Sequence, residues 1–410
     1  MQIRTYNVLR LLSRDFDVTA LCFYRAVEFN STEEVRRSVE GLRHLARVEA
    51  FPIPQERSKL RLISDHLRSI LTGRVYTLFA YESEQFRQRL GELVETQPFK
   101  LVHMDSMDLA GYLPKLAGLP VICVHHNVES ALLRRRAATT RGLAARYMTL
   151  QARFSEKEER RWCPAFTLNV AVSDEDRDAF RRIAPVAPFI VVPNGVDTKI
   201  FRPGTGPEEG IVFVGAHSWQ PNRDAMERFC LEVLPRIRAG GIKARVVWIG
   251  RASEALKREY AVRFGVELTG YVSDIRPLVQ GAACYVAPLR SGGGTRLKIL
   301  DAWAMGKAVV STTVGCEGLA ARDGENILIR DTPERFADAV GQVLTDENLR
   351  RRLGNHARKT AEVLYDWEVI GQPMLAHYHQ LRTLAENSRN GDDTRRQQPE
   401  SRLVGKKSRL

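Results

Sequence analysis

The chain has 410 residues, 44% of them hydrophobic and 27% charged, which is enough for two or three globular domains with their own cores. No run of about 18 apolar residues occurs, which excludes a membrane-spanning helix, and the first residues do not have the pattern of a signal peptide. The formal net charge of +13 favours anionic partners such as nucleotide phosphates, nucleic acid or an acidic membrane surface. The six cysteines are scattered and lie mostly in apolar runs, which predicts buried free thiols in a reducing cytoplasm.

The first half of the chain is predicted to alternate helices and strands. It starts with an amphipathic helix at 3–12 and a strand at 18–23, whereas a doubly wound domain is expected to begin with a strand and a glycine loop. The elements predicted next are helices 32–47, 58–71, 84–96 and 106–117 and strands 48–53, 100–104 and 120–124. This alternation predicts a parallel sheet that binds ligands beyond the carboxyl ends of its strands.

Polar side chains follow two of these strands. His103 and Asp105 lie at the end of the first, and the segment 125–129, His-His-Asn-Val-Glu, follows the second. A single histidine is more often structural, but a histidine pair with Asn and Glu at the end of an apolar strand favours a functional site. Zinc is not expected, because no matching set of cysteines and histidines lies nearby in sequence.

Residues 131–161 are predicted to be helical and strongly basic. The stretch has nine Arg and Lys residues beside an apolar side that includes Leu132, Leu143 and Phe154. Two interpretations remain open. The charges can form a solvated face above a core stripe, or they can dock the protein on an anionic membrane, where each nearby basic residue contributes about 1 kcal/mol.

A linker is predicted at 191–203, VVPNGVDTKIFRP, because Pro193 and the Asn194-Gly195 pair interrupt regular structure. A second alternating series follows it. Its elements are strands 211–215, 244–249 and 266–269 and helices 222–239, 253–264 and 274–281. Three later helices are predicted at 333–345, 347–362 and 367–385.

The stretch 282–319 reads as strand, glycine loop, helix, glycine and strand. Ser291 is followed by three glycines, and Thr295 can cap the next helix with its hydroxyl. First-turn N–H groups, the helix dipole and the glycines suit a bound anion. Arg296 and Lys298 add two positive charges inside the helix, and Asp301 follows where it can accept hydrogen bonds from a sugar hydroxyl. The alternative is an ordinary glycine-rich connection with solvated charges.

This stretch resembles the signature region of family 4 glycosyltransferases (glycosyl transferases group 1), which are retaining enzymes. It is most similar to a subgroup with GGGTRLKILEA-type sequences, common in bacterial polysaccharide gene clusters. The segments HHNVESALLRRR and PNGVD also match family patterns. The family has two glutamates eight positions apart; the second aligns with Asp301, whereas the first aligns with Gly293 and is missing.

The resemblance implies an α/β chain of the GT-B fold, in which two doubly wound, Rossmann-like domains face a central cleft. The expected divisions are an acceptor-side domain at 1–193 without its first strand, a nucleotide-sugar domain at 194–365, a crossover helix at 366–385 and a disordered basic tail at 386–410.

The resemblance also implies the site residues. Those assigned to catalysis are His126, Arg296 and Lys298. Those assigned to donor binding are Gly215, Arg251, Tyr271, Val272, Gly293, Gly294, Thr295, Arg296, Lys298 and Asp301. The family usually has an arginine and a lysine after the strand that ends at Gly215, but here His217, Trp219 and Asn222 occupy that region. No metal and no cofactor apart from the nucleotide-sugar donor is expected.

We therefore expect transfer of a sugar from a nucleotide-diphosphate sugar to an acceptor hydroxyl with retention, in exopolysaccharide or lipopolysaccharide assembly. The expected acceptor is a sugar or a lipid-linked oligosaccharide. The expected location is the cytoplasm, with reversible binding to the inner face of the plasma membrane. Two alternatives remain, a non-catalytic nucleotide-sugar-binding scaffold and a GT-B sugar-nucleotide epimerase. Nucleic-acid binding is disfavoured, because the basic residues are spread out and lack interleaved aromatic side chains.

Overall fold

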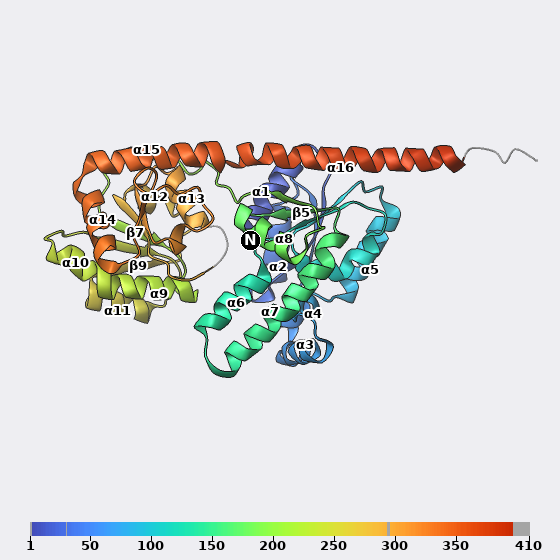
Figure 1. The fold of residues 1–410 in the computed structure, drawn as a ribbon, viewed down its shortest axis with the longest axis horizontal. Helices are drawn as coiled ribbons and strands as arrows, with labels where there is room; N and C mark the ends of the chain where they lie inside the picture. Colours follow the sequence, from blue (N-terminus) through green and yellow to red (C-terminus); the bar gives the residue numbers. More distant parts are fainter. Residues whose placement is uncertain (1, 30, 293–295, 397–410) are drawn as a thin grey trace, which may run out of the picture.

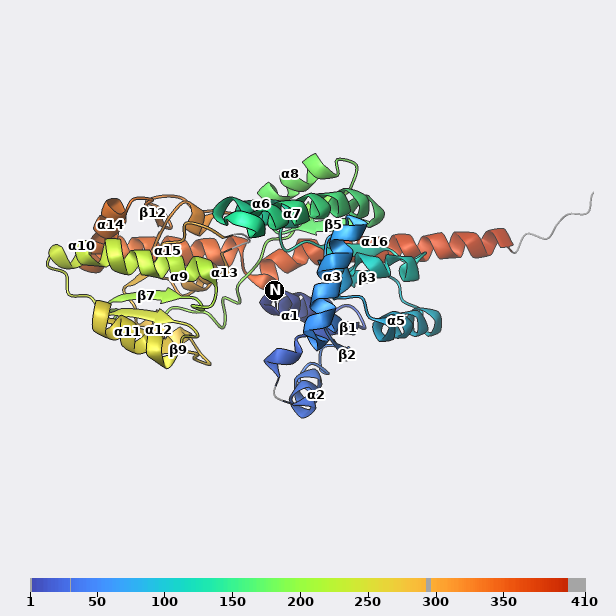
Figure 2. The same ribbon diagram turned by 90° about the horizontal axis from the view of Figure 1, so that it is seen from below.

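A computed structural model describes residues 2–29, 31–292 and 296–396 of the chain (Figures 1 and 2). The elements of the first half are α1 (Gln2–Leu12), β1 (Thr19–Tyr24), η1 (Ala26–Glu28), α2 (Thr32–Glu40), β2 (Arg47–Pro52), η2 (Pro54–Arg57), α3 (Lys59–Thr72), α4 (Thr77–Ala80), α5 (Glu84–Thr96), β3 (Val102–Met104), η3 (Met107–Leu116), β4 (Val121–Val124), α6 (Glu129–Thr139), α7 (Gly142–Trp162), η4 (Cys163–Ala165), β5 (Leu168–Ala171), α8 (Asp174–Ile183) and β6 (Phe189–Val191).

The second half is a further α/β series. Its elements are β7 (Ile211–Val214), α9 (Gln220–Arg228), η5 (Phe229–Val233), α10 (Leu234–Ala239), β8 (Val246–Ile249), α11 (Glu254–Phe264), β9 (Val266–Gly270), α12 (Arg276–Gln280), β10 (Cys284–Ala287), α13 (Leu297–Ala304), β11 (Val309–Ser311), η6 (Val314–Cys316), β12 (Leu328–Ile329), α14 (Pro333–Thr345), α15 (Glu347–Leu364) and α16 (Trp367–Arg396).

Each half has its own parallel sheet, as the alternating pattern predicts. The first half contains a four-stranded sheet in the order β3-β4-β5-β6, and β1 pairs with β2 in a separate two-stranded sheet. The second half contains a six-stranded sheet in the order β12-β11-β10-β7-β8-β9. In this sheet β7 is central, and the chain adds later strands on both sides of it. The strand order reverses there, which is where doubly wound sheets bind ligands.

The two halves meet along a pair of crossing segments. The N–H of Val196 in the linker donates to the carbonyl of Tyr365 over 2.8 Å, just before α16 begins. A Cβ on Gly195 would lie 2.7 Å from Ile370 and 2.8 Å from Trp367, so only glycine allows this close approach. The sequence predicts Gly195 as a turn residue. The structure shows a second reason for glycine at this position, which is its close packing against α16.

Helix α16 returns to the first half and packs against α1 (Figure 1). Leu11 of α1 lies in one core cluster with Ile370 and Tyr378 of α16 and with Val170 of β5. The helix continues to Arg396, beyond the predicted end at residue 385, and residues 397–410 of the predicted tail lie outside the described part of the chain.

Two further expectations can be compared with the structure. All six cysteines are free and five are buried, which confirms the prediction of unpaired buried thiols.

The helical stretch 131–161 is not continuous: α6 ends at Thr139, and Gly142, with a φ of 69°, starts α7 in the opposite direction (Figure 1). Among the described residues, no helix has the combination of length and hydropathy needed to cross a membrane.

Candidate functional site

The candidate site lies at the carboxyl edge of the six-stranded sheet, where β7 and β10 end side by side. Gly215 follows β7, and a Cβ there would lie only 2.5 Å from the amide nitrogen of Asn222. Glycine therefore lets Asn222 of α9 fold back over the end of β7, where its Nδ2 donates to the carbonyl of Ala216 over 3.0 Å. Asn222 is 3% exposed, so its remaining amide oxygen needs a donor from within the protein.

Lys298 is that donor. Its Nζ donates to the Oδ1 of Asn222 over 2.7 Å and lies 4.6 Å from the ring centroid of Phe213 and 5.8 Å from that of Trp219. Loss of contact with water, followed by the nearby charge of Arg296, lowers the pKa of Lys298 to about 7. No carboxylate of the described residues pairs with Lys298, so a bound anion would stabilise its charged form.

Arg296 is held more tightly than the sequence suggests. It is 3% exposed, and its Nη2 donates to the carbonyls of Val314 over 3.0 Å and Gly292 over 3.3 Å. A weaker contact joins Nη2 to an oxygen of Glu317 over 3.4 Å. Burial lowers the pKa of Arg296, although the charge of Glu317 opposes this shift. The guanidinium thus ties Gly292 to the segment after β11, which is a structural role that the sequence does not indicate.

Asp301 is one turn further along α13. Removal from water raises the pKa of its carboxyl group to about 7. The Asp301 charge also contributes to raising the pKa of the neighbouring Tyr285. A carboxyl group that is destabilised as an anion gains most from a ligand that donates hydrogen bonds to it.

The remaining predicted donor-binding residues fall into two groups. Arg251 follows β8 and its guanidinium carbon lies 5.2 Å from the ring centroid of Tyr271, which follows β9 and is 71% exposed. Val272 is next to Tyr271 and partly buried. The structure therefore brings the turns after β8 and β9 together on the same edge of the sheet as Gly215. Gly293, Gly294 and Thr295 lie outside the described residues.

The first half presents a second polar cluster, at the carboxyl ends of β3 and β4. The histidine pair predicted there is divided. His125 is buried and its Nε2 is 2.8 Å from the Oδ1 of Asn169, and burial lowers its pKa to about 4, which marks a neutral structural residue. His126 is 14% exposed in its side chain and its Nε2 is 2.8 Å from the carbonyl of Asp105.

Asp105 links this cluster to the two terminal helices. Burial alone would raise its pKa, but hydrogen bonds from His103 and His126 hold the pKa well below its ordinary range. His103 also contacts the hydroxyl of Tyr378 in α16 over 2.6 Å, and the hydroxyl of Thr5 in α1 donates to the Oδ2 of Asp105 over 2.5 Å. Asp105 is therefore an anion that orients both histidines.

A contact between the two halves involves Glu317, the carboxylate that faces Arg296. The Nη1 of Arg135, in α6, lies 3.2 Å from the same oxygen of Glu317 that faces Arg296. Glu317 is not among the predicted site residues, because no local sequence pattern indicates that a carboxylate after β11 would contact arginines from both halves. Within the described residues, no group of three or more His, Cys, Asp and Glu side chains is arranged to hold a metal ion.

Comparison with known protein families identifies this architecture. A sequence model described as Glycosyltransferase Family 4 matches residues 1–200, and one described as Glycosyl transferases group 1 matches residues 208–346. The chain belongs to the family 4 glycosyltransferases. The two matched regions correspond to the two halves described above, so each half of this glycosyltransferase is a recognised part of the family.

Curated relatives of this family 4 glycosyltransferase match it over part of their length. The D-inositol 3-phosphate glycosyltransferase of Corynebacterium urealyticum is 33% identical over 107 residues, which cover 26% of this chain and 25% of the relative. The phosphatidyl-myo-inositol mannosyltransferase of Mycobacterium tuberculosis is 26% identical over 228 residues, which cover 51% and 58%. The lipopolysaccharide core biosynthesis glycosyltransferase LpsE of Rhizobium meliloti is 32% identical over 122 residues, which cover 29% and 36%. The chain thus spans about a quarter to somewhat over half of these relatives.

Solved structures confirm the predicted GT-B fold. Anabaena HepE in complex with UDP and glucose superposes with a TM-score of 0.62 at 14% identity, covering 91% of this chain and 95% of HepE. Sucrose-phosphate synthase of Thermosynechococcus elongatus superposes with a TM-score of 0.59 at 16% identity, covering 90% of this chain and all of that one, 100%. Both alignments include both halves of the chain.

Proposed function

We propose that this family 4 member transfers a sugar from a nucleotide-diphosphate sugar to an acceptor hydroxyl with retention of anomeric configuration. The observation that carries the proposal is the position of Lys298, which Asn222 fixes at the switch point of the six-stranded sheet. In the part of the chain that the structure describes, no carboxylate pairs with it. A diphosphate placed there would accept hydrogen bonds from Lys298 and from loop N–H groups, while Asp301 accepts from the ribose. Retention rests on the family resemblance.

In the proposed reaction the bond between the sugar C1 and the diphosphate oxygen breaks, and a bond from C1 to the acceptor oxygen forms on the same face. The acceptor proton passes to the departing diphosphate. Lys298 stabilises the charge that develops on the diphosphate, which is a preorganised electrostatic effect. Arg296 contributes through its charge and by tying Gly292 to the segment after β11. His126, oriented by Asp105, would approach the donor sugar from the first half. No metal takes part in these steps.

The proposed setting is bacterial exopolysaccharide or lipopolysaccharide assembly in the cytoplasm, with a sugar or lipid-linked acceptor. Support comes from relatives whose names specify phosphatidyl-myo-inositol and lipopolysaccharide core as their targets. A non-catalytic scaffold is the second candidate, and one observation favours it: Gly293 replaces the first family glutamate.

Turnover assays separate these candidates. The protein is incubated with UDP- and GDP-sugars, with and without lipid extract, and the products are resolved by mass spectrometry. Transfer is shown by a free nucleoside diphosphate together with a glycosylated acceptor. An epimerised donor would indicate an epimerase, and saturable donor binding without any turnover would indicate the scaffold.

A further inference from the structure

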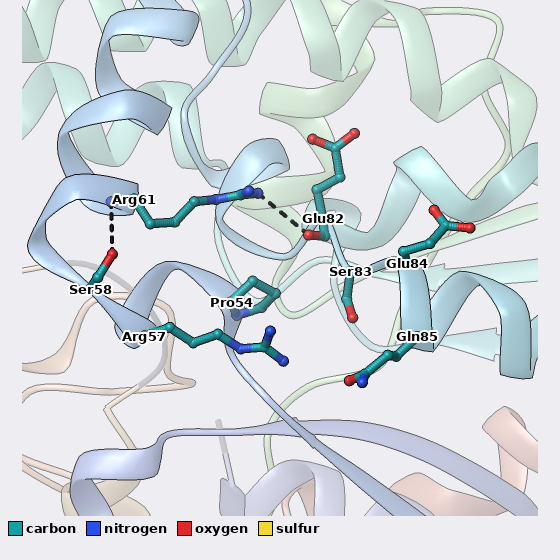
Figure 3. A pocket seen from close by; sticks show the side chains of 8 residues that line it. All are labelled: Pro54, Arg57, Ser58, Arg61, Glu82, Ser83, Glu84 and Gln85. Carbon is teal, nitrogen blue, oxygen red and sulfur yellow. Dashed lines mark hydrogen bonds between the residues drawn. The ribbon is translucent and has the colours of Figure 1, made fainter.

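Helix α3 is oriented with its polar side toward the protein. Asp65 and Ser69 are 1% and 0% exposed, although both are polar residues in the middle of a surface helix. The Nε of Arg61 lies 3.0 Å from Asp65, and the amide of Gln151 in α7 donates to the hydroxyl of Ser69 over 2.8 Å. Figure 3 shows Arg61 extending from α3 toward the carbonyl of Glu82, across a pocket at the start of the helix.

The apolar side of α3 consequently faces away from the protein. Its members recur at helical spacing on one face, and their exposed fractions are large: Leu60 79%, Ile63 56%, Leu67 56%, Ile70 48% and Leu71 86%. A surface helix of a soluble domain normally buries such a face. A contiguous exposed apolar patch of this kind marks a site that another apolar phase covers.

The charge around this face is positive. Segment 57–74 has five basic residues and one acidic residue, and the acidic one, Asp65, is buried and paired with Arg61. Arg61, Arg68 and Arg74 are paired with Asp65, Glu82 and Glu158, and Arg57 extends into the pocket of Figure 3. Lys59, next to Leu60, is exposed and has no ion-pair partner within the described part of the chain. An apolar face bordered by basic residues is the pattern of helices that lie in the interface of an anionic bilayer.

The basic stretch 131–161, selected from the sequence, does not have this arrangement. Leu132, Tyr147 and Phe154 are half-buried. Leu143, at the start of α7, is the one large apolar residue of the stretch that is strongly exposed, at 81%. Arg134 and Arg135 are engaged by carboxylates within the protein. The turn between α6 and α7 nevertheless lies on the same side of the molecule as α3, opposite α16 (Figure 1).

We propose that α3 is the membrane-binding element of this protein and that its outer apolar face, Leu60, Ile63, Leu67, Ile70 and Leu71, inserts into the interface of an anionic bilayer. Lys59 then contacts lipid phosphates, and the exposed Arg136, Arg141 and Arg146 around the turn between α6 and α7 add a weaker, purely electrostatic contact. The proposal does not depend on glycosyl transfer, because it concerns a surface away from the donor-binding edge.

The test uses the full chain and vesicles of phosphatidylcholine with or without 30% phosphatidylglycerol, an amount on the order of natural anionic content. Sedimentation with the anionic vesicles is expected for the wild type. The variant L60Q/L67Q/L71Q should bind at least about tenfold more weakly, since it removes three of the apolar side chains. The matched control V186Q/L231Q/V262Q alters three exposed apolar residues elsewhere and should bind as the wild type does.

A second measurement places the helix. An environment-sensitive fluorophore on L67C should become brighter with anionic vesicles, whereas the same label on V262C should not, after subtraction of the wild-type background. Equal binding of L60Q/L67Q/L71Q and the wild type, or an unchanged signal at L67C, would overturn the proposal. If the wild type ignores vesicles and instead forms a dimer that L60Q/L67Q/L71Q abolishes, the face is covered by a second copy and the membrane assignment is wrong.

Discussion

The Nζ of Lys298 lies 2.7 Å from the Oδ1 of Asn222, which ties the helix after the glycine loop to the helix after β7. The two residues are far apart in sequence, and the contact holds the lysine ammonium at the switch point of the sheet. Asn222 provides an oxygen but no charge, so the lysine keeps its capacity to neutralise an anion.

Replacing Lys298 with alanine is expected to weaken binding of the donor and of its nucleoside diphosphate product. A charge-assisted hydrogen bond contributes roughly 1.5–3 kcal/mol, which corresponds to an affinity loss on the order of 10- to 100-fold. Titration calorimetry with the best nucleoside diphosphate measures the change. Lys359, exposed on α15, provides the charge-matched control K359A. Equal affinity of K298A and K359A would remove Lys298 from the diphosphate site.

Replacing Arg296 with alanine is expected to affect both stability and turnover, because the guanidinium donates to the carbonyls of Val314 and Gly292. Leaving those buried acceptors unsatisfied should lower the free energy of unfolding by about 1–3 kcal/mol. Donor turnover should fall as well, on the order of tenfold or more. Thermal and urea unfolding give the first quantity and initial rates the second. Unchanged rates in a folded R296A protein would show that the residue is structural alone.

Replacing Asp301 with asparagine is expected to raise the apparent KM for the donor. Asparagine keeps an acceptor oxygen but loses the charge that strengthens hydrogen bonds from ribose hydroxyls. The 2′- and 3′-deoxy forms of the donor should bind the wild type more weakly than the parent donor does. Their affinities for D301N and for the wild type should be nearly the same. If the deoxy donors bind the wild type as well as the parent donor does, Asp301 does not contact the ribose.

Binding of a nucleoside diphosphate is expected to be strongest near pH 7. Lys298 has a pKa of about 7 in the free protein, so above that pH a bound diphosphate must draw in a proton and affinity should fall by up to about tenfold per pH unit. Asp301 also has a pKa of about 7, raised by removal from water, so below that pH its carboxylate must lose a proton to accept from ribose. K298M should flatten the alkaline limb and D301N the acidic limb. A limb that persists in its variant belongs to another group.

Turnover is expected to persist in excess EDTA. The positive charge of Lys298, with Arg296 behind it, neutralises the diphosphate in the proposed reaction, which leaves no step for a divalent cation. Initial rates are compared before and after dialysis against chelator, with added Mg²⁺ and Mn²⁺ as separate conditions. A loss of activity that either cation restores would show that the diphosphate is held through a metal.

Much of the fold could be predicted from local patterns. Helix 84–96 and the strands near 121 and 211 were predicted within a residue or so of α5, β4 and β7, because buried parallel strands are short apolar runs bounded by turn residues. The break between α6 and α7 was missed. Its signal was Gly142, whose positive φ allows the chain to reverse there, but a single glycine in a helical pattern is not decisive.

The candidate site was predicted in part. Lys298, Asp301, Gly215 and the turns that contain Arg251 and Tyr271 do lie on one edge of the sheet, because carboxyl ends of parallel strands meet there. Their partners depend on packing. No sequence pattern indicates that Arg296 would donate to the backbone carbonyls of Gly292 and Val314. The contact with Val314 joins segments that only the folded chain brings together.

Local sequence patterns are enough to specify two α/β halves, a glycine-rich segment before a basic helix, and no long apolar span. Tertiary structure decided which side of each helix is buried. In α3 the spacing of leucine and isoleucine specifies an apolar face, and a reader of the sequence alone would turn that face inward. The folded protein turns it outward, because Ser69 accepts from Gln151 of α7 and Arg61 donates to the carbonyls of Phe79 and Glu82 on the inward side of the helix. Side-chain pairing across distant segments, which no local pattern encodes, sets that orientation.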